Sequence, residues 1–176
     1  YQMESVIPDP RDGETVRQKK LFYSALASLA AKVPQYCRDR LRLPESYIKT
    51  LQELEDDDFR LEAIASSDEM FIGLGFSPEG REYLLSSKDV TELPALPDSG
   101  DEQLQPRWNQ WVYELFSVTA DAFHKNEPAA CLVYGIHRDE GEILARSRVT
   151  RRKEVIRRGH YFLRPRFPAA RFFNPQ

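Results

Sequence analysis

Proline restricts the fold of this chain more than any other residue type. The 176 residues include 12 prolines, spread from Pro8 to Pro175. Each proline fixes its own φ angle and lacks a backbone N–H, so it begins or ends a helix and interrupts a strand. We therefore expect short elements, with long helices only where the sequence between prolines has a clear helical period.

Two segments have that period. The first runs from Glu14 to Val33, ends at Pro34, and repeats apolar residues at a spacing of three and four: Leu21, Phe22, Ala25, Leu26, Leu29 and Val33. The second follows Pro106, and its apolar and aromatic residues occupy most of the helical circumference: Trp108, Trp111, Val112, Tyr113, Leu115, Phe116, Thr119, Ala120, Ala122 and Phe123. A helix of this composition is expected to be central and buried.

The residues after Pro128 predict strands. Residues 130–137 (ACLVYGIH) form a short apolar run, 139–141 (DEG) have the composition of a turn, and 143–149 alternate between two faces. We therefore predict a β-hairpin here, with a third strand at 161–163. Residues 150–158 fit either a short helix or a basic loop.

Together these patterns predict an α+β fold with a mostly helical N-terminal lobe, a long buried aromatic helix and a small C-terminal antiparallel hairpin. We divide the chain into a flexible arm (1–12), a helical lobe (13–86), an acidic proline-rich linker or loop (87–105), and a long helix plus β-hairpin with a basic C-terminal segment (106–176). The apolar fraction of 41% and charged fraction of 30% are those of an ordinary globular protein.

The two cysteines indicate a reducing compartment. Cys37 and Cys131 are far apart and have no CxxC spacing, so we expect two buried, unpaired thiols, although a disulfide between them stays open. The sequence has no apolar run as long as a membrane span and no signal-peptide pattern at its start. We therefore expect an intracellular protein, cytoplasmic or nuclear, without membrane contact.

The charge of the chain is divided by position. Residues 1–137 contain 14 Lys or Arg against 24 Asp or Glu, whereas residues 138–176 contain 11 against 4, and ten of those eleven are Arg. Arginine presents a rigid fork of donors that matches phosphate and carboxylate groups. The C-terminal segment therefore suits a polyanion or an acidic protein surface.

Our first hypothesis is a non-enzymatic binding subunit that contacts nucleic acid through this segment. The candidate binding residues are Arg146, Arg148, Arg151, Arg152, Lys153, Arg157, Arg158, Tyr161 and Phe162. The arginines would contact phosphates, and the two aromatic rings offer planes on which unpaired bases stack. A purely structural alternative also stays open, in which the aromatic residues belong to the core and the arginines pair with the acidic lobe.

Two further hypotheses use other parts of the chain. In the second, the protein is an adaptor or assembly subunit of a larger complex, which binds an acidic partner and uses the apolar residues 70–76 as a hydrophobic anchor. In the third, a hydrolase or nuclease uses His137 with Asp139 or Glu142. No local nucleophile, phosphate-loop or zinc-protease motif is present, and the acidic run 53–58 lacks the ligand spacing of a calcium loop, so we expect no cofactor and no metal.

Overall fold

The computed structural model describes residues 13–94, 96, 97 and 99–172, and the arm predicted for residues 1–12 lies outside this part. Helices dominate the described residues: α1 (Gly13–Lys32), α2 (Pro34–Asp39), α3 (Glu45–Leu54), α4 (Asp58–Ala65), α5 (Pro78–Leu85), α6 (Leu104–Lys125), α7 (Glu127–Tyr134), α8 (Arg138–Arg146) and α9 (Val149–Arg158). The described residues also form two short strands and a 3₁₀ turn: β1 (Ile72–Gly75), β2 (Phe162–Pro165) and η1 (Ala169–Phe172). The predicted mostly helical α+β fold is confirmed.

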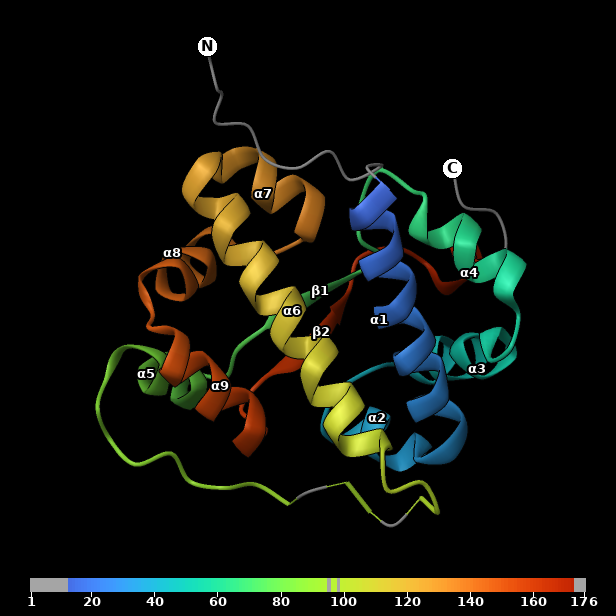
Figure 1. Ribbon diagram of the computed structural model, residues 1–176, viewed down its shortest axis with the longest axis horizontal. Helices are drawn as coiled ribbons and strands as arrows, with labels where there is room; N and C mark the ends of the chain where they lie inside the picture. Colours follow the sequence, from blue (N-terminus) through green and yellow to red (C-terminus); the bar gives the residue numbers. More distant parts are fainter. Residues whose placement is uncertain (1–12, 95, 98, 173–176) are drawn as a thin grey trace.

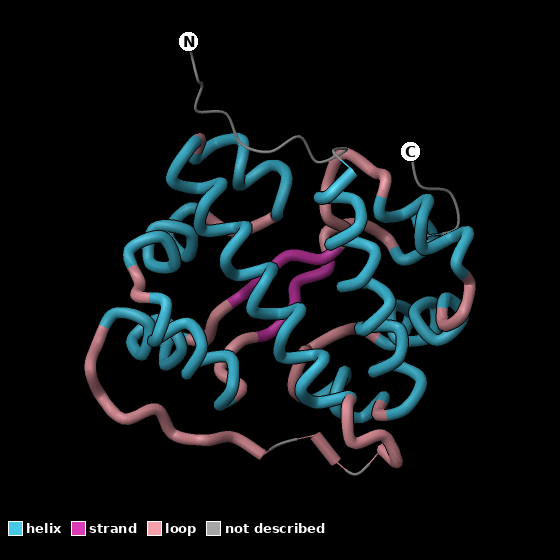
Figure 2. The backbone as a smooth tube through the Cα atoms, in the orientation of Figure 1, coloured by secondary structure: helices cyan, strands magenta, loops and turns pink. Residues whose placement is uncertain are grey.

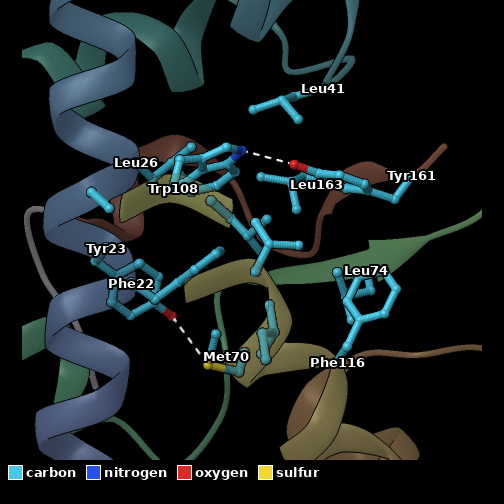
Figure 3. Close-up of a cluster of buried hydrophobic side chains, with 14 of the residues drawn as sticks. Phe22, Tyr23, Leu26, Leu41, Met70, Leu74, Trp108, Phe116, Tyr161 and Leu163 are labelled. Atoms are coloured by element: carbon cyan, nitrogen blue, oxygen red, sulfur yellow. Dashed lines mark hydrogen bonds between the residues drawn. The ribbon is translucent and has the colours of Figure 1, made fainter. Parts of the chain in front are cut away.

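The long aromatic helix α6 crosses the middle of the molecule beside α1, as Figure 1 shows. Its Trp108 is fully buried and stacks on Phe22 of α1, with 5.6 Å between the ring centroids. The indole Nε1 of Trp108 donates a hydrogen bond of 2.8 Å to the hydroxyl of Tyr161 (Figure 3). The predicted burial of this helix is thus confirmed, and α6 ties α1 to the C-terminal strand.

Prolines begin several of the short helices, as their fixed φ angle favours. Pro34 and Pro78 lie in the first turns of α2 and α5, and Pro128 lies in the first turn of α7. Ser77 caps α5, because its hydroxyl accepts a hydrogen bond of 3.1 Å from the backbone N–H of Gly80.

The antiparallel pair lies among the helices and joins segments far apart in the sequence (Figure 2). Ile72 pairs with Pro165, and Gly75 pairs with Phe162. A Cβ atom on Gly75 would lie 2.5 Å from the Phe162 ring, so the ring lies over the space that a side chain at this position would take.

The location predicted for the hairpin is wrong, because this part of the chain is helical. Residues 130–134 lie in the second half of α7, and residues 138–146 and 149–158 form α8 and α9. Gly135 has a φ of 68° and ends α7 in the left-handed conformation. Asp139 and Glu140 lie in the first turn of α8, where the helix dipole favours carboxylates. Of the predicted strands, only the one at 161–163 overlaps a real one, β2, and its partner β1 comes from the N-terminal half.

Both cysteines lie within the described residues, and one of them departs from the expected burial. Cys37 and Cys131 are both free thiols; Cys37 is buried and Cys131 is half-buried. Within residues 13–94, 96, 97 and 99–172, none of the helices combines the length and apolar character that a membrane span needs.

Candidate functional site

The predicted basic residues do not form one continuous surface. Arg152 shows this most clearly, because it is buried. It is 8% exposed and lies on the inner face of α9 beside Val155. Its Nε donates to Ser147 Oγ at 2.9 Å, and its Nη2 donates to the carbonyl of Leu144 at 3.2 Å. Arg152 therefore fastens α9 to the end of α8 and is not available to a ligand.

Arg157 and Arg158 are neutralised inside the chain. Both donate to the carboxylate of Glu154, at 2.9 and 2.8 Å, and Arg158 also pairs with Glu92 at 3.0 Å. The hydrogen bonds from Arg158 and Arg157 hold the pKa of Glu154 below its usual value. This end of α9 therefore presents little free positive charge.

The two predicted stacking residues are also engaged. Tyr161 is 5% exposed and accepts the hydrogen bond from Trp108. Phe162 is half-buried, and the guanidinium carbons of Arg42 and Arg164 lie 4.2 and 5.4 Å from its ring centroid. Neither ring is a free platform for an unpaired base, so the stacking part of the nucleic-acid hypothesis loses its support.

The remaining predicted arginines gather around one surface depression, which we call the basic hollow. It measures about 410 Å³ and is lined by Leu84, Leu85, Ser86, Ser87, Arg146, Arg148, Thr150 and Arg151. Arg146 and Arg148 are exposed and have no hydrogen-bond or ion-pair partner among the described residues. The wall thus combines three arginines and three hydroxyl groups with no carboxylate.

Local structure fixes this arrangement. Arg146 ends α8, Arg148 is the residue that precedes α9, and Arg151 lies in the first turn of α9. The guanidinium of Arg151 donates to the carbonyls of Tyr83 at 3.0 Å and Lys88 at 2.8 Å. These bonds hold Arg151 against the end of α5, so at least one cation of the hollow is already positioned.

Apolar side chains are exposed at the same place. Leu85, which lines the hollow, is 44% exposed, and Val149, between two lining residues, is 50% exposed. Beyond Arg151 the surface continues into a second depression, whose lining includes Asp89, Glu154 and Arg158, which pairs with Glu154. The positive field is therefore local, with leucine and valine beside it and carboxylates at its border.

Lys153 lies outside the hollow. It is exposed on α9, and its ammonium nitrogen is 5.3 Å from the ring centroid of Tyr113 on α6. This distance suits a cation–π contact, so the position of the Lys153 side chain is explained by a contact within the chain.

The groups named in the enzyme hypothesis lie at the start of α8, beside Glu140, a buried carboxylate that they do not include. His137 precedes α8 with its side chain 60% exposed, and its Nδ1 lies 3.8 Å from Glu140 Oε1. Glu140 is fully buried and accepts hydrogen bonds from the Phe76 N–H, from Arg164 and from Arg81, at 3.0 to 3.3 Å. Asp139 also pairs with Arg81, at 3.0 Å, and Glu142 is exposed on α8. Among the described residues, no three His, Cys, Asp or Glu side chains are grouped as metal ligands would be.

The anchor predicted for the adaptor hypothesis is wrong. Met70, Phe71 and Phe76 are each at most 2% exposed, because this segment forms β1 and its flanks in the core. Among the residues that the structure describes, the large exposed apolar ones lie elsewhere: Phe59, Leu85, Leu132 and Val149. Sequence reasoning missed them because the sequence does not show which apolar residues of a short helix face outward: Leu132 and Leu85 follow apolar neighbours that are more buried.

Comparisons with known proteins find no matching family model, no similar curated protein and no similar solved structure.

Proposed function

We propose that this protein is a non-enzymatic binding subunit whose basic hollow holds an acidic segment of a partner protein. The observation that carries the proposal is the combination of Arg146, Arg148 and Arg151 with the exposed side chains of Leu85 and Val149. Arginine is enriched in protein–protein interfaces, where it lies beside buried apolar area.

The chemistry of the hollow fits carboxylates. Each guanidinium can donate two parallel hydrogen bonds to one carboxylate, and these charge-assisted bonds are roughly twice as strong as neutral ones. Arg151 loses little side-chain entropy on binding, because Tyr83 and Lys88 already hold it. The backbone N–H groups at the start of α9 add a favourable helix dipole.

The border of the hollow favours a protein partner over a nucleic acid. A phosphate backbone that continued past Arg151 would meet Asp89, and it would find Arg158 already paired with Glu154, so this border offers a second phosphate no unpaired arginine. The exposed Leu85 also gains nothing from a phosphate. An acidic polypeptide can place carboxylates on the arginines and an apolar side chain on Leu85 and Val149.

Nucleic acid is the second candidate, and the absence of carboxylates from the wall of the hollow favours it. In this case the three arginines would neutralise about three phosphates. The logarithm of the binding constant would then fall by roughly 2.7 per decade of salt for duplex DNA.

Fluorescence anisotropy with four probes tests the proposal: an acidic peptide with leucine and phenylalanine between its carboxylates, the same peptide with serine at those positions, and a single-stranded and a duplex oligonucleotide. We expect Arg148→Ala and Leu85→Ser each to weaken binding of the first peptide about tenfold, and Arg157→Ala, which removes an arginine from the same helix outside the hollow, to leave it unchanged.

The two variants separate the candidates. If an oligonucleotide binds best, and Arg148→Ala weakens that binding while Leu85→Ser does not, the hollow is a phosphate site and the protein-partner proposal is wrong. If both variants bind the first peptide as wild type does, the hollow is not the binding surface.

A further inference from the structure

A second exposed feature lies in the helical N-terminal half, and we call it the acidic corner (residues 53–62). This stretch contains six carboxylates and one arginine. Phe59, in the first turn of α4, is 82% exposed, which makes it the most exposed of the large apolar residues that the structure describes. Contact between an apolar ring and water is unfavourable, so burying this phenylalanine against a partner would contribute favourably to the free energy of binding.

Some of the carboxylates around Phe59 form ion pairs with Lys20, and others form none. Lys20 of α1 lies 2.7 Å from Asp58 and 3.1 Å from Glu62, so one cation is shared by two carboxylates. Glu55 and Asp56 have no hydrogen-bond or ion-pair partner within the described part of the chain. The corner therefore keeps a net negative charge beside an exposed aromatic ring.

The acidic corner and the basic hollow complement each other in two properties. One has carboxylates around an exposed phenylalanine, and the other has three arginines beside an exposed leucine and valine. A hollow of about 410 Å³ is within the size range of protein pockets that take a side chain or small ligand. The two surfaces match in both charge and hydrophobic character.

The two surfaces cannot meet within one molecule. Figure 1 shows α4 on the opposite side of the molecule from α5, α8 and α9, with α1 and α6 between them. A contact between them therefore requires two copies, and it would leave one free corner and one free hollow at the ends of each pair. Such head-to-tail contacts extend into rings or open chains.

We propose that the occupant of the basic hollow is the acidic corner of a second copy of this chain, with Phe59 packed against Leu85 and Val149. This inference rests on the proposed function and names its partner. The carboxylates of the corner face Arg146 and Arg148 across the contact. Since the charges are at the surface, association weakens as salt screens them.

Sedimentation velocity of the full chain, across protein concentrations at low and high salt, tests the proposal. We expect concentration-dependent assembly larger than a dimer at low salt, and its loss at high salt. Phe59→Ser and Arg148→Glu each remove one half of the contact, so each variant alone should require at least tenfold more protein to assemble. The glutamate precedes α9, where the helix dipole favours it, so the fold is preserved.

Mixing the two variants gives the diagnostic result. Phe59→Ser retains an intact hollow and Arg148→Glu retains an intact corner, so an equal mixture should form a one-to-one dimer that grows no further. Leu132→Ser is the matched control: it removes an apolar residue that is 61% exposed on α7, outside both surfaces, and should assemble as wild type does.

A wild-type chain that stays monomeric at low salt, or a Phe59→Ser chain that assembles as readily as wild type, overturns this inference. The proposed function is judged separately, by the binding of the acidic peptide to Phe59→Ser alone, at protein concentrations below those at which this variant should assemble. If that variant binds the peptide but wild type does not assemble, only the self-docking is wrong. If it binds no peptide, the proposed function fails as well.

Discussion

Replacing Glu140 by alanine should destabilise the fold by about 3 kcal/mol. Its side chain is fully buried, and its two carboxylate oxygens accept from the Phe76 N–H at 3.0 Å, from Arg164 at 3.0 and 3.2 Å, and from Arg81 at 3.3 Å. Removing one partner of a buried ion pair typically costs about 3–5 kcal/mol, because it leaves the other charge uncompensated.

The lower end of that range applies, because the two arginines are partly hydrated. The side chains of Arg164 and Arg81 are 24% and 35% exposed, and Arg81 keeps its pair with Asp139. For a chain of this length, about 3 kcal/mol corresponds to a fall in melting temperature of roughly 6–12 °C.

Urea denaturation followed by circular dichroism measures the effect. Glu142→Ala is the matched control, since Glu142 is exposed on the same helix, and it should change the free energy of unfolding by no more than about 0.5 kcal/mol. If the two variants are equally stable, the ion pair between Glu140 of α8 and Arg164 of β2 does not stabilise the fold.

Two further predictions concern buried titratable groups. Burial raises the pKa of the Cys37 thiol to about 12, so a thiol-specific disulfide reagent at pH 8 should modify the half-buried Cys131 first, and Cys37 only after urea is added; simultaneous modification of both in the folded state would contradict this. Burial also lowers the pKa of Lys19 to about 8, below the roughly 10.4 of an unfolded chain, so between these values the unfolded state binds more protons and the free energy of unfolding should rise with pH relative to Lys19→Met. Urea titrations of both proteins at pH 7.5 to 10 measure this difference, and a difference that stays constant would refute the pKa assignment.

Helix α6 was predictable because its signal is local. Trp108, Val112 and Phe116 recur every four residues, and all three are fully buried. A helix places such residues on one face whatever the rest of the chain does. The same reasoning located α1, whose apolar stripe faces α6.

The hairpin was mispredicted because tertiary contacts decide the role of its glycine. Gly141 follows two acids, as turn glycines often do, but it lies inside α8, and a Cβ there would be 2.3 Å from the Phe123 ring. The glycine lets α8 pack closely on α6. The real strand pair joins Gly73 to Arg164, and no local pattern marks a pairing at such a separation.

The candidate site was predicted in part, for a related reason. Arg146 and Arg148 are exposed as expected, although they lie at helix ends and not on a strand. Arg152 was predicted at the interface because it belongs to the basic run 151–153, in a segment that fitted a loop as well as a helix. In the helix it shares the buried face with Val155 and Ile156, so its burial follows from a periodicity that the ambiguous assignment did not use.

Methyl-resolved NMR tests the central claim most directly, because it reports on individual side chains of the basic hollow. On titration of Phe59→Ser with the acidic, apolar peptide, the methyl signals of Leu85 and Val149 should shift together and saturate. Those of Leu132, which is more exposed than either and lies on α7 outside the hollow, should stay in place. Unmoved Leu85 and Val149 signals, or shifts of the same size at Leu132, would contradict the account.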